Sequence, residues 1–328
     1  MRKLARHIIE GVAAATVIFA AVPASAADKV ELIYSDTVAE TDRRSEILRE
    51  NFAGCLGEGF DFKPYFGATL FKQGTELTAM QRGNLDMASL AIYDFYNQVP
   101  HTSILGTAYL YRDYDHLRKV TASGVLDDLW AEVQDKAKVK ILANPYIGTR
   151  QVNLRSDKKV MTPADLSGVK LRMPGGEGWQ FVGEALGANP TPMAFTEVYT
   201  ALQTGAIDGQ DNPLPADKSM KFYEVTKQII LTGHLVANNQ FAISMSKWDS
   251  MNAEQQAKVQ ECALNFQGAL DKSTLDQEAE LVDFFKGEGL SIYEPDKKAF
   301  RDHVLKKYLD SKYSKDWPEG LLDKINAL

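Results

Sequence analysis

A nine-residue segment of this chain occurs twice, and the repeat restricts the folds that the chain can adopt. Residues 78–86 (TAMQRGNLD) recur as residues 200–208 (TALQTGAID), 122 positions later, with Thr, Ala, Gln, Gly and Asp in the same places. In each copy a helix end leads to a glycine that can take a positive φ, and then to the start of a strand. A period of this length excludes a solenoid. It favours two similar α/β lobes, with chance similarity between two helix–glycine–strand units as the alternative.

Predicted strands and helices alternate along both halves of the chain. The first third has strand patterns at 30–34, 60–65 and 85–90 and helical patterns at 43–52 and 75–82. The helix that starts at Arg43 is predicted to end at Gly54. From residue 252 to 286 the pattern is helical, broken at most near Gly268. This order favours helices packed on largely parallel sheets, and we expect the long helix to touch both lobes.

The first 26 residues have the composition of an export signal. Arg2, Lys3 and Arg6 form a positive start, Gly11–Val22 is an apolar run, and Ala24-Ser25-Ala26 is a small-residue cleavage site. The run is 12 residues long, whereas a helix that spans a bilayer needs about 20. We therefore predict a cleaved signal and an exported protein, with an N-terminal membrane anchor as the alternative.

The charge of the chain argues against a nucleic-acid partner. The full chain has a formal net charge of −7 and no basic stripe. Removal of residues 1–26 takes three of the 37 basic and one of the 44 acidic side chains, which leaves a net charge of −9. An anionic ligand of so acidic a protein would need local positive groups in its site.

Cysteine and histidine are rare in the chain. Cys55 and Cys262 are the two cysteines, and in an exported protein they can form a disulfide or be two buried apolar side chains. The four histidines that follow residue 26 have no i,i+3 or i,i+4 spacing: His101, His116, His234 and His303. We therefore predict no metal site.

Sequence motifs of catalysis are missing as well. The chain has no G-x-S-x-G, H-E-x-x-H, P-loop or C-x-x-C motif. Gly175-Gly176-Glu177-Gly178 lacks the dinucleotide-binding spacing and is interpreted as a loop. We expect no cofactor and no enzymatic activity.

Two arginines beside predicted strand ends are candidates for binding an anion. Arg150 enters a strand, and Arg172 lies in the apolar run Val169–Met173 just before a Pro-Gly-Gly turn. A buried charge needs a partner. Each arginine can therefore form an ion pair with an acidic side chain, or hold the carboxylate of a ligand in a bidentate grip.

Other polar and aromatic residues could complete such a site. Asn212 follows a strand and precedes a proline, so its amide can point into a cleft or make an Asx turn. Tyr93, Trp179 and Phe195 can form the apolar walls of a ligand site or belong to the core.

The run from Leu166 to Pro213, with LSGVKLRMPG at its start and MAFTEVYTALQTGAIDGQDNP at its end, resembles the DctP-type solute-binding proteins of TRAP (tripartite ATP-independent periplasmic) transporters. GTRQ at 148–151 and FYEV at 222–225 also match this family. The resemblance implies an α/β, two-lobed, type II-like periplasmic-binding-protein fold. Each lobe would be a mixed, mostly parallel sheet flanked by helices, with a long helix spanning both. We expect lobe I to comprise residues 27–149 and about 238–275, and lobe II residues 150–237 and about 276–328.

The resemblance also assigns roles to residues. It implies that Arg172 forms the salt bridge to a ligand carboxylate, that Asn212 lies beside it, and that Arg150 makes a second contact. Phe195 would line the pocket. Three further residues complete the predicted binding set: Trp179, Tyr93 and Gln240.

The family implies a periplasmic, monomeric protein that captures a small organic acid and delivers it to a TRAP permease. A protein that presents the anion to a sensor kinase, or a periplasmic enzyme on the same scaffold, is the alternative. Residues 87–94 (MASLAIYD) are mostly apolar and aromatic where sugar-acid-binding members carry an acidic group. This departure predicts a compact, partly apolar keto, hydroxy or aromatic acid, and leaves dicarboxylates and sulfonates open.

Overall fold

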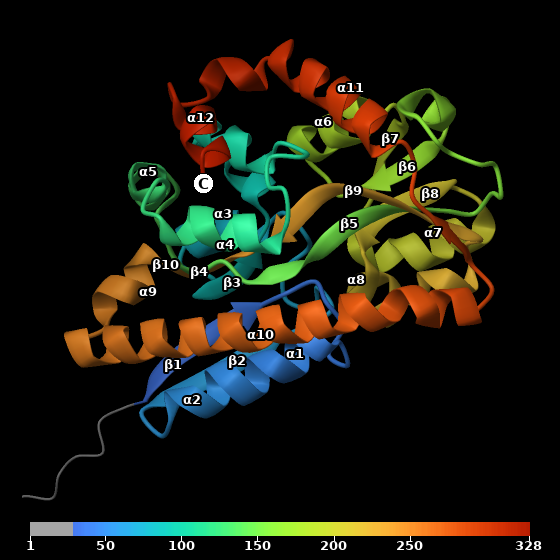
Figure 1. The fold of residues 1–328 in the computed structure, drawn as a ribbon. Coiled ribbons are helices and arrows are strands. Elements are labelled where there is room, and N and C mark those ends of the chain that lie inside the picture. Colours follow the sequence, from blue (N-terminus) through green and yellow to red (C-terminus); the bar gives the residue numbers. More distant parts are fainter. Residues whose placement is uncertain (1–28) are drawn as a thin grey trace, which may run out of the picture.

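The computed structural model describes residues 29–328, so the predicted export signal at residues 1–26 lies outside the described residues. The chain forms two sheets, each covered by helices, and one long helix runs past both (Figure 1). The predicted two-lobed α/β fold is confirmed. Between residues 29 and 328, no helix has the length and apolar character needed to cross a bilayer.

The first sheet has five strands in the order β2-β1-β3-β10-β4. Their bounds are β1 (Val30–Ser35), β2 (Phe60–Tyr65), β3 (Met87–Leu90), β4 (Val139–Ala143) and β10 (Gln240–Ser244). β1 pairs in parallel with β2 and β3, whereas β10 runs antiparallel to β3 and β4. Pro64 lies in the edge strand β2, where a missing N–H is tolerated.

The second sheet has six strands in the order β11-β9-β5-β8-β6-β7. Their bounds are β5 (Tyr146–Leu154), β6 (Lys170–Met173), β7 (Asn189–Pro192), β8 (Gly209–Pro213), β9 (Gln228–Asn238) and β11 (Ser291–Tyr293). The chain enters this sheet after Asn144-Pro145 and returns to the first sheet at Asn239. We predicted that the chain passes from the first lobe to the second between residues 149 and 150, but this position lies inside β5.

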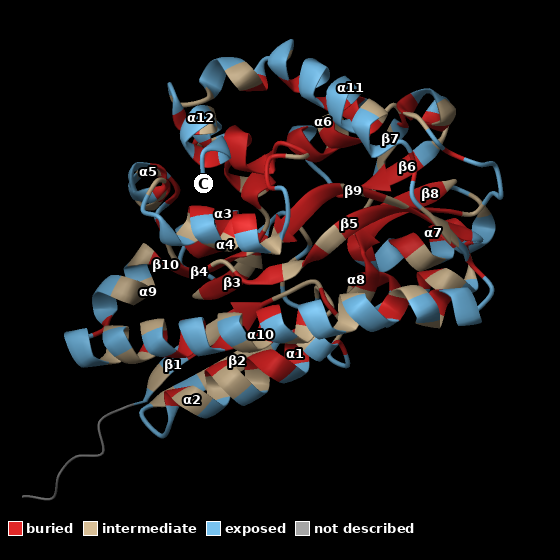
Figure 2. Cartoon of the chain, viewed as in Figure 1, coloured by how far each residue is buried: buried red, intermediate tan, exposed pale blue. Residues whose placement is uncertain are grey.

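The helices cover the outer faces of the sheets and leave the strands buried (Figure 2). Their bounds are α1 (Arg43–Ile47), α2 (Gly54–Leu56), α3 (Glu76–Gln81), α4 (Tyr114–Ala122), α5 (Asp127–Ala137), α6 (Glu177–Ala185), α7 (Val198–Thr204), α8 (Leu214–Ser219), α9 (Met245–Ser250), α10 (Ala253–Gly287), α11 (Lys297–Leu309) and α12 (Leu321–Asn326). The chain after α11 packs on the first lobe, because Ser103 donates to the Tyr313 carbonyl and His116 Nε2 lies 2.9 Å from the Ile325 carbonyl. The domain prediction placed residues 276–328 with the second lobe, where β11 pairs with β9 and α11 packs on β9 and α6.

The repeated segment has the same structure in both lobes and makes the same contact with a neighbouring strand. Gly83 and Gly205 end α3 and α7 with φ of 75° and 79°, which an L side chain rarely adopts. Asp86 then accepts the N–H of Ile33 on β1, and Asp208 accepts the N–H of Lys170 on β6, both at 2.9 Å. Each aspartate thus ties its strand to the neighbouring parallel strand, so the repeat is part of the scaffold.

α10 connects the two lobes over 35 residues and continues through Gly268 without a break. Its N-terminal half packs on the helical segment from Arg43 to Leu56, and its C-terminal half packs on α8 and β11. Where it crosses the junction, Asp271 accepts the N–H of Tyr146 at 2.7 Å and Glu278 accepts that of Thr149 at 2.6 Å. The start of β5 is therefore fixed to α10 by two carboxylates.

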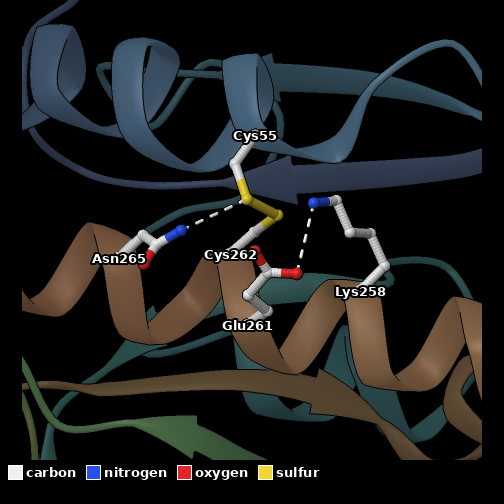
Figure 3. The surroundings of a disulfide bond; sticks show 5 residues. All are labelled: Cys55, Lys258, Glu261, Cys262 and Asn265. Carbon is white, nitrogen blue, oxygen red and sulfur yellow. Dashed lines mark hydrogen bonds and ion pairs between the residues drawn. A yellow bond between two sulfur atoms is a disulfide. The ribbon is translucent and has the colours of Figure 1, made fainter.

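A disulfide joins α10 to α2. Cys55 and Cys262, for which the sequence left two alternatives, are bonded at an S–S distance of 2.02 Å (Figure 3). Asn265 and the Lys258–Glu261 ion pair lie beside the bond on the exposed side of α10. The bond closes a loop with a sequence separation of 207 residues.

Removal of this disulfide should destabilise the first lobe. We expect the Cys55→Ser/Cys262→Ser variant to lose about 2–5 kcal/mol of unfolding free energy, because the long loop is no longer closed in the unfolded chain. Urea unfolding with and without a reductant measures this loss. The reductant should lower the stability of the wild type to that of the variant and leave the variant unchanged. A wild-type transition that is insensitive to full reduction would contradict the expected role.

Candidate functional site

A cavity of about 330 Å³ lies between the two lobes. Its lining from the first lobe and the junction includes Asp36, Arg44, Gln73, Glu76, Tyr93, Asp94, Asn97 and Asn239, and its lining from the second includes Arg150, Arg172, Trp179, Phe195 and Asn212. Six of the seven predicted binding residues are thus brought together in one cavity. Gln240 is not among its lining residues: it is buried in β10, opposite Leu90 of β3.

Arg172 is a buried guanidinium without a carboxylate partner. It lies near the carboxyl end of β6, and only 1% of its surface is exposed. Nε and Nη2 donate to the Met193 carbonyl at 2.9 and 2.7 Å, and Nη2 also lies 3.3 Å from Oε1 of Gln73 in the first lobe. No acidic side chain of residues 29–328 lies within ion-pair distance of it. Burial lowers the pKa of Arg172 to about 9, so the group is still charged at neutral pH.

Arg150, by contrast, has an internal counter-ion. Its Nε and Nη2 donate to the two carboxylate oxygens of Asp211 at 2.7 and 3.0 Å. His234 Nε2 lies 3.1 Å from the same carboxylate, and the Trp179 ring centroid lies 4.7 Å from the guanidinium carbon. Burial alone would raise the pKa of Asp211, but Arg150 and His234 outweigh it and hold that pKa well below its usual range. The charge of Arg150 is therefore neutralised before any ligand arrives.

Asn212 and the aromatic side chains of Trp179 and Phe195 shape the rest of the second-lobe wall, and Tyr93 of the first lobe packs against it. Asn212 donates its amide to Oε1 of Gln210 on the same strand. The Tyr93 and Trp179 rings, one from each lobe, lie with centroids 4.0 Å apart. The Phe195 ring centroid is 5.8 Å from the Arg172 guanidinium carbon.

The first-lobe wall differs from the expectation. The stretch 87–94 contributes Ser89, Ala91, Tyr93 and Asp94 to the lining, and Asp36, Gln73 and Glu76, which lie outside that stretch, make this wall polar. Asp36 follows β1 directly, and ligands of α/β sheets bind beyond the carboxyl ends of strands. That rule could have identified Asp36 from the sequence. Glu76 is the first residue of a helix that follows a long loop, and no sequence pattern marked it as a residue of the site.

Three hydrogen bonds join the lobes at and beside the cavity. Gln73 Oε1 accepts the Phe195 N–H at 2.9 Å in addition to its contact with Arg172. The Ser219 hydroxyl of α8 donates a hydrogen bond to the Asp42 carboxylate at 2.6 Å, and the same carboxylate accepts a hydrogen bond from the Arg44 guanidinium. The lobes are therefore closed on the cavity. In the part of the chain from 29 to 328, no three His, Cys, Asp or Glu side chains are grouped so that they could hold a metal ion.

Comparison with known proteins identifies the family. Residues 45–316 match the family model of the bacterial extracellular solute-binding proteins, family 7 (DctP). The chain belongs to the DctP family. The sialic acid-binding periplasmic protein SiaP of Vibrio cholerae is 33% identical over 264 residues, which cover 80% of this chain and 81% of that protein. The resemblance inferred from residues 166–213 is therefore confirmed.

Solved structures of DctP-family proteins share the fold. A TRAP periplasmic solute-binding protein of Roseobacter denitrificans with bound 3-deoxy-D-manno-oct-2-ulosonic acid (KDO) has a TM-score of 0.89 and 46% identity, covering 92% of this chain and 99% of that one. A second protein of that organism, with bound L-galactonate, has a TM-score of 0.81 and 26% identity, covering 92% and 98%. DctP-family proteins are extracellular solute-binding proteins, and these relatives bind acidic sugars.

Proposed function

We propose that this protein captures a sugar acid in the periplasm and delivers it to a TRAP membrane permease, without chemical conversion of the ligand. The observation that carries the proposal is Arg172, a buried guanidinium that lines the cavity and has no acidic partner. A ligand carboxylate would supply the missing negative charge. It would also pair with the planar fork in two parallel hydrogen bonds.

The polar first-lobe wall supports a polyhydroxylated ligand in place of the compact, partly apolar acid expected from residues 87–94. Asp36, Glu76, Asp94 and Asn97 line the same cavity as Arg172 and carry oxygen atoms that can accept hydrogen bonds. Sugar hydroxyls are donors that match them. The relatives with bound KDO and L-galactonate support the same class of ligand.

Binding follows from closure of the lobes. In the open state a carboxylate reaches Arg172, and closure brings the first-lobe acceptors onto the hydroxyls. Exclusion of water then strengthens the ion pair. The ligand stabilises the closed state only by as much as it binds that state more tightly.

A thermal-shift screen tests the proposal. The mature protein is unfolded and refolded to remove any co-purified ligand, and is then mixed with hydroxy acids and with their neutral amides. A ligand at 100 times its Kd should add about 2.7 kcal/mol of stability, a shift of several degrees. We expect shifts with sugar acids such as KDO and none with the amides. Shifts caused only by neutral or cationic compounds would refute the carboxylate site.

A further inference from the structure

A network of three amide side chains connects the cavity to the interior of the second lobe. The Asn212 amide nitrogen donates to Oε1 of Gln210, two residues earlier on β8. The Gln210 amide nitrogen donates in turn to Oδ1 of Asn153 on the neighbouring strand β5, at 3.2 Å. Gln210 and Asn153 are fully buried, whereas Asn212 lines the cavity. This amide network therefore runs from the middle of the sheet to the proposed binding site.

The buried end of the amide network can have only one orientation. Nδ2 of Asn153 lies 3.0 Å from the Gln228 carbonyl oxygen, which can only accept a hydrogen bond. It also lies 2.9 Å from the Thr226 hydroxyl oxygen, and that hydroxyl donates its own proton to the Phe222 carbonyl at 2.8 Å. The nitrogen of Asn153 must therefore face these two acceptors, and its oxygen must face Gln210.

This orientation determines that of the next two amides. Because Oδ1 of Asn153 accepts, Gln210 presents its nitrogen to it, and the same nitrogen donates to Oδ1 of Asp217 at 2.8 Å. Oε1 of Gln210 then faces Asn212 and can only accept from it. Oδ1 of Asn212 makes no hydrogen bond with any group of residues 29–328. That oxygen and the second N–H of Asn212 are the groups left for a ligand.

We propose that Gln210 is a positioning residue, which orients the Asn212 amide for the sugar acid before the ligand binds. The two ends of an asparagine amide have nearly the same shape, so without a fixed partner the group can turn over. With Nδ2 held by Gln210, the amide needs no ordering when the ligand arrives. Gln210 is not among the residues that line the cavity, so its effect on affinity passes through Asn212. This inference rests on the proposed function, because it assumes that the sugar acid contacts Asn212.

A double-mutant cycle tests the inference by calorimetric titration with KDO or, where KDO does not bind, with the sugar acid that gives the largest thermal shift. Gln210→Met should raise the Kd of the wild type at least about fivefold, but change that of Asn212→Ala less than about twofold, because no amide is left to orient. Gln228→Met is the matched control. It removes another buried glutamine amide of the same lobe, which donates to the Ser156 and Lys158 carbonyls, and keeps the main-chain carbonyl of residue 228. It should lower the stability to urea and leave the Kd unchanged.

The outcomes separate this inference from the proposed function. If Gln210→Met binds the acid as the wild type does, or weakens Asn212→Ala as much as it weakens the wild type, Gln210 does not act through Asn212. If Gln228→Met weakens binding as much as Gln210→Met, the loss comes from a general loosening of the lobe. Either result overturns the inference, while binding by the wild type still supports the proposed function. If the wild type binds no sugar acid, both fail.

Proton exchange of the Asn212 side chain tests the inference without a substitution, in case Gln210→Met does not fold. In side-chain amide spectra of the unliganded, 15N-labelled protein, at least one Nδ2 proton of Asn212 should exchange with water about tenfold more slowly than those of Asn84. Asn84 is exposed, and its side chain makes no hydrogen bond with residues 29–328. Equal exchange at the two residues would overturn the inference.

Discussion

Replacement of Arg172 by methionine should abolish ligand binding and leave the unliganded protein at least as stable as the wild type. The loss in binding free energy should be about 3–5 kcal/mol, roughly two to almost four orders of magnitude in Kd, since the ligand carboxylate would be buried without a partner. The effect on stability has the opposite sign. Arg172 is a desolvated charge with no carboxylate within ion-pair distance in residues 29–328, so an apolar side chain in its place removes the cost of burying that charge.

The neighbouring arginine gives a matched control. Arg150→Met removes the partner of Asp211 and leaves that carboxylate buried, so this variant should lose stability. Calorimetric titration with KDO and urea unfolding of both variants measure the two effects. A Kd of Arg172→Met within threefold of the wild type would remove Arg172 from the site. Equal destabilisation by both substitutions would show that Arg172 has a structural counter-charge.

Asp211→Asn should be among the most destabilising single substitutions in the second lobe. Asp211 is fully buried, holds Arg150 with both oxygens and lies 3.1 Å from His234 Nε2. The amide removes the negative charge and leaves a buried guanidinium unpaired, which costs about 3–5 kcal/mol. Urea unfolding of the variant and the wild type measures this difference.

The pH dependence of that difference follows from the depressed pKa of Asp211. The folded carboxyl holds its proton less tightly than the unfolded one, whose pKa is about 4. Its contribution is therefore fully present above the unfolded pKa and is lost as the pH falls towards the folded pKa. We expect a constant gap between wild type and variant from pH 8 to pH 5, and a smaller gap below about pH 4. A gap that closes between pH 7 and pH 5 would contradict an ionised, paired Asp211.

The fold could be predicted from the sequence where local chemistry determines the structure. The two copies of the repeat combine a glycine at a positive φ with an aspartate that ties parallel strands, and these requirements are visible in the residues. The helix from Arg43 was predicted less well. Gly54 has a helical φ of −62° and lies within the helix, a π-helical turn spans Leu48–Ala53, and the chain leaves the helix at Gly57, whose φ is 77°. Long-range contacts with α10, including the Cys55 disulfide, lie on this segment, and periodicity cannot show them.

The residues that the second lobe contributes to the site could be predicted from the sequence, whereas most of those from the first lobe could not. Arg172, Asn212 and Phe195 belong to one continuous run of characteristic residues. Asp36 follows β1 and Glu76 is the first residue of α3, and only the folding of the first lobe brings them to the cavity. The prediction for Gln240 illustrates the same limit, because a strand pattern does not show which face of a central strand looks into a cleft.

A crystal structure of this protein with KDO tests the central claim most directly. We predict that the KDO carboxylate lies about 2.8 Å from the guanidinium nitrogens of Arg172. Its hydroxyls should lie within hydrogen-bond distance of acidic side chains of the first-lobe wall. A carboxylate that points to Arg44, or Arg172 without any contact to the ligand, would contradict the account.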